Sequence, residues 1–174
     1  MIDPKYPVGE FTFDKNVTPE KRIAMINELA GFAASLRSLV RGLSDANLDT
    51  PYRKGGWTIR QLTHHVADSS LNWYSRFKMA LTEQNPVIKP FDQDAWSALT
   101  DAQTMPPEVS VNLLESVHAR MAAVLRTLTP ADFARTMVHP ERGEISVDYT
   151  LQTLHWHTRH HLSHIERLRK ESGW

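Results

Sequence analysis

Four long stretches of the chain carry apolar residues every three or four positions, and helix-breaking residues separate them. Such a stripe on a helix has to be buried against other helices. In a chain of 174 residues this pattern predicts one all-α domain, residues 1–174, built as a four-helix bundle. The predicted helices span about 18–43, 58–81, 107–128 and 147–171, with a long connection between the second and the third.

The second of these helices has the clearest start. Thr58 and Gln61 fit a capping box, in which each side chain satisfies a free backbone N–H of the other residue, and Trp57 can pack onto Leu62. The first helix is predicted to begin after Thr18 as N-cap.

The segments between the helices differ in character. Residues 1–17 are rich in proline, glycine and charge and predict an extended arm. Residues 85–106 form a long loop, with one short helix around 92–99, and loops of this length often form lids or pocket walls. Residues 134–147 predict an irregular turn or a small hairpin around Glu141-Arg142-Gly143.

Composition excludes several classes of function. The 20 basic and 20 acidic residues cancel, so we expect no nucleic-acid partner and no anionic membrane surface. Without cysteine there is no disulfide, no thiolate metal site and no cysteine nucleophile. No segment is predicted to approach a membrane span, and the N-terminus has no apolar signal region, so a cytoplasmic protein with a small-molecule substrate is expected.

Five of the nine histidines lie between residues 155 and 164, within the last predicted helix. Neutral imidazole is the commonest metal ligand in proteins. On a helical wheel His157 and His161 lie at the edge of the apolar arc, so this i, i+4 pair is best placed to face the bundle interior. His155 and His160 are predicted at the surface, and His164 lies between these positions.

The second helix offers His64 and His65, of which the wheel places His65 at the apolar edge and His64 outward. His65, His157 and His161 are therefore predicted to hold a divalent metal ion and to leave one position open, as in catalytic sites. Zinc, nickel, copper and cobalt all suit three imidazoles.

Other residues near this site each have more than one candidate role. Asp68 could orient a ligand imidazole, although an exposed helix carboxylate is favoured. Arg76 could meet an anionic substrate or form a salt bridge. His164 could lie just behind the ligands and support them, contact the substrate, or pack as a structural residue. Trp73, Trp96 and Trp156 could line a pocket, although large aromatic residues more often belong to the core.

Three segments carry a resemblance to a known family: LDTPYRKGGWTIRQLTHHVADS, RFKMALTE and WHTRHHLSHIERL. The chain resembles the DinB/YfiT-like superfamily of bacterial four-helix-bundle metalloproteins, and within it the YfiT branch, described as metal-dependent hydrolases and as bacillithiol S-transferases. The family pattern W-[ST]-x6-H matches Trp57, Thr58 and His65. The pattern H-x3-H matches His157 and His161, with His164 where glutamine is common.

The resemblance thus selects the same three ligands as the helical wheel. It implies a homodimeric cytoplasmic protein that binds zinc or nickel. It also implies a low-molecular-weight thiol as a candidate co-substrate.

Three functions remain open from the sequence. The first is transfer of a thiol group that a bound metal holds as thiolate, and the second is hydrolysis by a water molecule that the metal activates. The third is a non-catalytic metal-binding or stress-response protein. A fourth protein ligand, from His164 or Asp68, would favour this third function.

Overall fold

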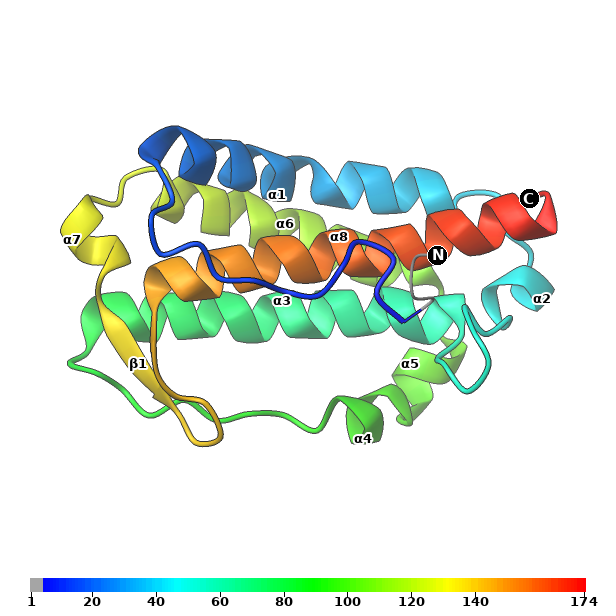
Figure 1. Ribbon diagram of the computed structural model, residues 1–174. Coiled ribbons are helices and arrows are strands. Elements are labelled where there is room, and N and C mark those ends of the chain that lie inside the picture. Colours follow the sequence, from blue (N-terminus) through cyan, green and yellow to red (C-terminus); the bar gives the residue numbers. More distant parts are fainter. Residues whose placement is uncertain (1–4) are drawn as a thin grey trace.

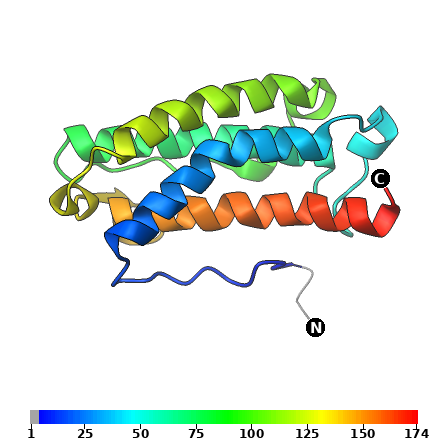
Figure 2. The ribbon, with the colours of Figure 1, turned by 90° about the horizontal axis from the view of Figure 1, so that it is seen from above.

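The computed structural model describes residues 5–174 and contains four long helices, in agreement with the predicted four-helix bundle (Figure 1). These helices are α1 (Pro19–Val40), α3 (Ile59–Thr82), α6 (Pro107–Leu125) and α8 (Val147–Ser172). Each packs on two others, in the cyclic order α1, α6, α3, α8. Helices α1 and α8 run in one direction and α3 and α6 in the other (Figure 2).

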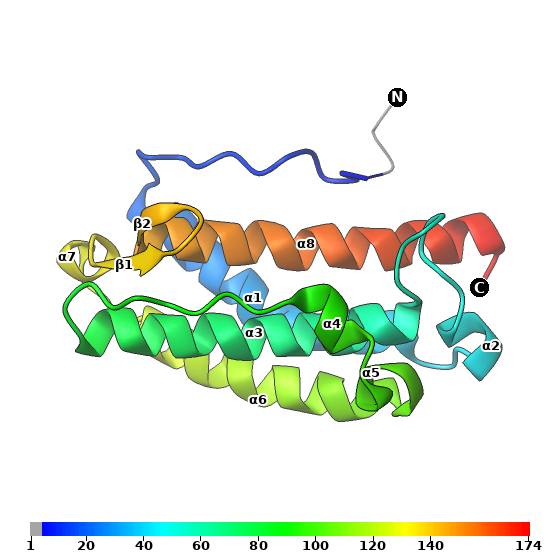
Figure 3. The same cartoon turned by 90° about the horizontal axis from the view of Figure 1, so that it is seen from below.

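Because α3 and α6 are parallel neighbours, the chain must return along the bundle between them. Residues 83–106 make this return and confirm the predicted long connection (Figure 3). It contains two short helices, α4 (Gln93–Ser97) and α5 (Thr100–Thr104), where the sequence predicted one. Asp92 caps α4, accepting hydrogen bonds from the backbone N–H groups of Asp94 and Ala95.

The helix starts are as predicted. Thr58 and Gln61 form the capping box of α3, and Thr18 caps α1. Two ends are shorter than predicted, because α1 stops at Val40 and α6 at Leu125. Two short helices, α2 (Asp45–Leu48) and α7 (Pro130–Phe133), lie in segments where none was predicted.

The segment before α8 is a hairpin of strands β1 (Thr136–His139) and β2 (Gly143–Ser146), one of the two predicted alternatives. A three-residue loop joins the strands, and Gly143 has φ +74°, which glycine adopts without strain. Residues 86–88 pair with β1 through Val87 and Val138, so the return connection is fixed beside the hairpin.

The predicted N-terminal arm lies extended along α8 in its described part, residues 5–17 (Figures 1 and 3). Residues 1–4 lie outside the described residues. Asp14 exchanges two backbone hydrogen bonds with the side chain of Gln152, and Trp156 Nε1 donates to the Gly9 carbonyl. The arm is therefore one wall of the space beside α8.

The apolar core consists of two clusters, one toward each end of the bundle. On α8, Leu151 and Leu154 belong to one cluster and Ile165 to the other. The histidines of α8 lie between them. Contrary to prediction, one helix, α1, is long and apolar enough to span a membrane by length and composition. A bundle-core helix meets the same criteria, and six residues of α1 are buried here.

Candidate metal centre

His65 lies two turns into α3, and the capping box fixes the start of this helix. Its ring centroid is 4.4 Å from that of Trp57, the residue just before the cap. Only 3% of His65 is exposed. The apolar packing of Trp57 therefore holds the imidazole against the side of α3 that faces α8.

The structure brings the three predicted ligands together. The Nε2 atom of His157 lies 3.4 Å from Nε2 of His65 and 3.0 Å from Nε2 of His161. One ligand nitrogen from each residue falls within 4.8 Å of the other two. Within residues 5–174 this is the one group of three or more histidine or acidic residues with such spacing.

This nitrogen set fits a divalent cation. Two nitrogens about 2.05 Å from a tetrahedral metal lie ~3.3 Å apart, close to the two measured separations. Three neutral imidazoles with converging nitrogens have too few protons to hydrogen-bond one another fully. The Nδ1 atoms of His157 and His161, on the other side of each ring, are also buried without a hydrogen-bond partner among the described residues, but they are not the converging atoms. A cation at the centre would accept all three lone pairs.

Burial keeps these imidazoles neutral. It lowers the pKa of His65 to about 4. The pKa values of His157 and His161 are held well below the ordinary range, first by burial and then by the neighbouring histidines. The three side chains therefore carry free lone pairs at neutral pH, which is the form that binds metal.

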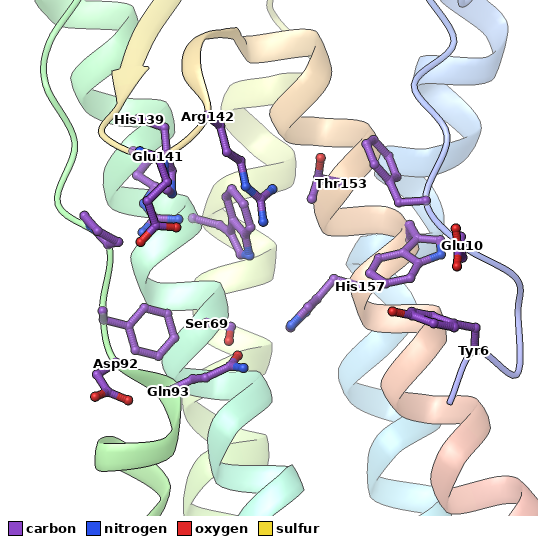
Figure 4. Close-up of a pocket in the computed structure, with 16 residues that line it drawn as sticks. Tyr6, Glu10, Ser69, Asp92, Gln93, His139, Glu141, Arg142, Thr153 and His157 are labelled. Carbon is purple, nitrogen blue, oxygen red and sulfur yellow. Dashed lines mark hydrogen bonds between the residues drawn. The ribbon is translucent and has the colours of Figure 1, made fainter. Parts of the chain in front are cut away.

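Two cavities meet at the cluster. The large cavity, of about 690 Å³, lies between the arm, α3, residues 90–93, the hairpin and α8, and it is lined by Ser69 and His157 (Figure 4). The small cavity, of about 470 Å³, lies beside residues 52–57 and is lined by His157 and His161. The return connection forms a wall as predicted, and His139 of the hairpin reaches the cavity, one of the two roles considered for it from the sequence, whereas the wall from the arm was not predicted.

His164 is buried but lies outside the group of three. Its Nε2 atom is 3.2 Å from Nε2 of His160, and its ring centroid is 4.4 Å from that of Tyr52. Asp68 makes no side-chain hydrogen bond to His65, and burial, followed by the charge of Asp101, raises its pKa to about 6. Neither residue therefore supplies a fourth ligand among the described residues.

The prediction that His64 points to solvent is wrong. It is 5% exposed, with Nδ1 2.6 Å from Ser110 Oγ and Nε2 3.1 Å from the Met105 carbonyl. The reason is that α3 is covered on more than one side, by α5 and α6 as well as by α8. Two adjacent histidines are thus both buried, on different sides of one helix.

The predicted surface positions of His155 and His160 hold only in part, since both are half-buried. His155 pairs with Glu28 on α1, and the ring of His160 stacks on Trp156. Of the three tryptophans, Trp73 and Trp156 line the large cavity, whereas Trp96 packs on Phe91.

The remaining two histidines have separate surroundings. His118 is buried in the bundle, hydrogen-bonded to Ser70 and to the Leu29 carbonyl. His139 ends β1 and lines the large cavity, as does Arg76 from α3. Arg76 makes no ion pair among residues 5–174, so the salt bridge considered from the sequence is not formed.

Comparisons with known proteins agree with this architecture. The family model of the DinB superfamily matches residues 28–165. A protein of Oceanobacillus iheyensis named "Putative metal-dependent hydrolase" is 45% identical over 173 residues, which is 99% of this chain and all of that protein. YfiT of Bacillus subtilis, which carries the same descriptive name, is 42% identical and covers 99% of this chain and 98% of its own length.

Two solved structures share the fold. That of Bacillus subtilis YfiT, described as having an unusual four-helix bundle topology, superposes with a TM-score of 0.96 over 99% of both chains. A mycothiol-dependent maleylpyruvate isomerase superposes with a TM-score of 0.64 at 20% identity, over 86% of this chain and 63% of its own, and this likeness concerns the fold alone. From the family match and the full-length relatives, this chain is a member of the DinB superfamily.

Proposed function

We propose that this protein is a metal-dependent hydrolase whose reaction takes place where His65, His157 and His161 meet. The observation that carries the proposal is the convergence of three neutral imidazoles, two buried and one half-buried, at the junction of two cavities. The names of full-length relatives more than 40% identical support the same class of enzyme.

A divalent cation held by these imidazoles would act as a Lewis acid and supply a nucleophile from water or from a thiol at neutral pH. The side chains around the cluster hold it rigidly and shield it in part from bulk water. Ser69 Oγ lies 3.2 Å from Nε2 of His65 and lines the large cavity, so its hydroxyl can orient a reacting group by a hydrogen bond. The aromatic rings of Trp57 and Phe91 flank His65 and limit the access of bulk water.

The open ligand set supports an enzyme over a metal store. A store gains from a closed set of four protein ligands, whereas a catalyst needs a free position that faces a cavity. Three imidazoles and no carboxylate form the cluster within residues 5–174. This arrangement leaves room for a substrate group.

The test of the site compares His161→Ala with His160→Ala. Both substitutions remove an imidazole from the same turn of α8. His161 is buried and belongs to the cluster, whereas His160 is half-buried and does not belong to it. We expect His161→Ala to lose most bound metal and all metal-dependent ester hydrolysis, with far-UV circular dichroism nearly unchanged. We expect His160→Ala to keep its metal stoichiometry by elemental analysis. Equal metal content in the two variants would contradict the ligand assignment.

Thiol transfer is the second candidate, and the paired cavities favour it. A transfer reaction needs space for two substrates, and the large and small cavities both border His157. The lack of cysteine means that the thiol would come from a co-substrate.

An assay that offers glutathione or bacillithiol with 1-chloro-2,4-dinitrobenzene, beside nitrophenyl esters and amides, separates the two reactions. Thiolate attack forms a C–S bond and releases chloride. Metal-dependent loss of the chloroarene only when thiol is present would support transfer. Metal-dependent ester or amide cleavage without thiol would support hydrolysis. Turnover that does not depend on metal would contradict both.

A further inference from the structure

Arg76 is a buried cation without an anionic partner in the described part of the chain. It is 7% exposed, its Nη2 atom donates to the Lys89 carbonyl at 3.0 Å, and its guanidinium carbon lies 4.9 Å from the ring centroid of Trp73. Among residues 5–174 it forms no ion pair. A buried charge is costly unless it is paired, so a guanidinium that opens onto a cavity is suited to an anion from outside the chain.

The hairpin brings two further donors to the same end of the large cavity. Arg142 projects from the hairpin loop into the space between α3 and α8 (Figure 4). Its charge, after burial, is the second cause that lowers the pKa of Arg76, so the two guanidinium groups repel each other across the cavity that both of them line, together with Glu141.

His139 is the third donor. Its Nδ1 atom accepts a hydrogen bond from the backbone N–H of Glu141 at 3.2 Å, so in the neutral ring the proton lies on Nε2. Burial, followed by the charges of Arg142 and Arg76, lowers the pKa of His139 and favours this neutral form. A neutral imidazole N–H and two guanidinium groups together match the two oxygens of a carboxylate.

The large cavity also has acidic lining residues, which limit the charge of its ligand. Its five fully charged side chains carry two positive and three negative charges, the latter from Glu10, Asp92 and Glu141. Oδ1 of Asp92 is engaged as the cap of α4. Such a lining accepts one negative charge at the two arginines but disfavours a phosphate dianion.

We propose that Arg76, Arg142 and His139 bind the carboxylate of the substrate at the end of the large cavity remote from the three-histidine cluster. Positions 65 and 76 on α3 are separated by ~16 Å along the helix axis. Trp73, Phe91 and Phe11 also line this cavity. The substrate class is therefore an elongated monocarboxylate with an apolar or aromatic middle and a reactive group at its far end. The identity of the reacting end rests on the proposed function, whereas the carboxylate site does not.

The test measures binding without turnover. Isothermal titration calorimetry compares 4-phenylbutanoate with its neutral analogue 4-phenylbutanamide and with 3-phenylpropyl phosphate. We expect the carboxylate to bind at least tenfold more tightly than the amide or the phosphate. Arg76→Gln and Arg142→Gln should each reduce the preference over the amide to less than threefold. The matched control is Arg120→Gln, which removes an exposed arginine that also lies over an aromatic ring, 5.5 Å from the Tyr74 centroid, but lines neither cavity.

Each titration is repeated on chelator-treated protein and on His161→Ala. Preferential carboxylate binding that survives both treatments supports the proposal even if no hydrolysis is ever found. Binding that disappears with the metal would overturn it, because the carboxylate would then be a metal ligand. Tighter binding of the phosphate, or an unchanged preference in Arg142→Gln, would also overturn it. Arg142 is exposed in a loop, so Arg142→Gln should fold and tests the carboxylate site even if Arg76→Gln does not fold.

Discussion

The buried imidazole of His118 on α6 predicts that the bundle loses stability below pH 6.5. His118 is 1% exposed, with Nδ1 2.7 Å from the Leu29 carbonyl of α1 and Nε2 3.0 Å from Ser70 Oγ of α3. It therefore links three of the four long helices. Burial lowers its pKa from 6.5 to about 4, against a smaller opposing effect of the Leu29 carbonyl. The neutral ring donates through Nδ1 to that carbonyl and accepts the Ser70 hydroxyl proton at Nε2.

The direction of this pH dependence of stability follows from proton linkage. An unfolded chain binds a proton on this histidine near pH 6.5, whereas the folded chain does so only near pH 4, so acid favours the unfolded state. The effect is absent well above pH 6.5 and complete below pH 4. At about 1.4 kcal/mol for each pH unit between the two pKa values, the full loss is about 3 kcal/mol, and the loss at pH 5 is about 2 kcal/mol.

Urea denaturation of metal-free protein at pH 7.5 and pH 5.0, followed by far-UV circular dichroism, measures this contribution. Other buried histidines add to the pH dependence of the parent protein, so the quantity to compare is the difference from His118→Gln. The decrease in the free energy of unfolding from pH 7.5 to pH 5.0 should be about 2 kcal/mol smaller in His118→Gln than in the parent protein. Ser70→Ala keeps the imidazole and serves as the control. It should lower stability by about 1 kcal/mol at both pH values. A parent and a His118→Gln variant with equal losses would refute the burial argument.

Two further substitutions test the surroundings of the cluster on α3. His64→Ala should cost about 2 kcal/mol in urea denaturation, because it leaves the buried Ser110 hydroxyl without its imidazole partner and removes one hydrogen bond to the Met105 carbonyl, yet metal content by elemental analysis should stay unchanged. A large loss of metal in this variant would place His64 among the ligands. Thr58→Ala should cost about 1 kcal/mol through loss of the helix cap, again with the metal retained. An unchanged urea denaturation midpoint in Thr58→Ala would mean that the capping box does not contribute to stability.

The sequence predicts the cluster well because helix geometry is local. The spacing of His157 and His161 fixes their relative direction whatever surrounds the helix, and the capping box at Thr58 fixes the start of α3 and therefore the face that His65 occupies. His64 shows where this reasoning stops. A helical wheel assumes one buried face, but α3 contacts α5, α6 and α8, so the number of buried faces depends on the packing of distant segments.

The cavity walls depend on such distant contacts. Nothing near Asp14 in the sequence indicates that its backbone pairs with Gln152, 138 residues away. Likewise, His139 and Arg142 reach Arg76 only because the hairpin is fixed beside the return connection at Val87 and Val138. Two arginines far apart in the sequence and a histidine before a proline give no local signature of an anion site. Only the fold brings these residues together.

The polar residues of the bundle interior form a band between its two apolar clusters, and this band relates stability to function. On α3 the change from one cluster to the other falls at Ser69 and Ser70. Ser70 turns toward His118 in the dry interior, whereas Ser69 turns toward His65 and the large cavity. The same level of the bundle thus holds a satisfied polar network on one side and, on the other, three converging imidazoles whose few protons cannot satisfy every Nε2 atom. Buried polar groups are normally satisfied within the protein. We therefore expect a ligand from outside the chain to bind on the side that departs from this rule, between the two apolar clusters.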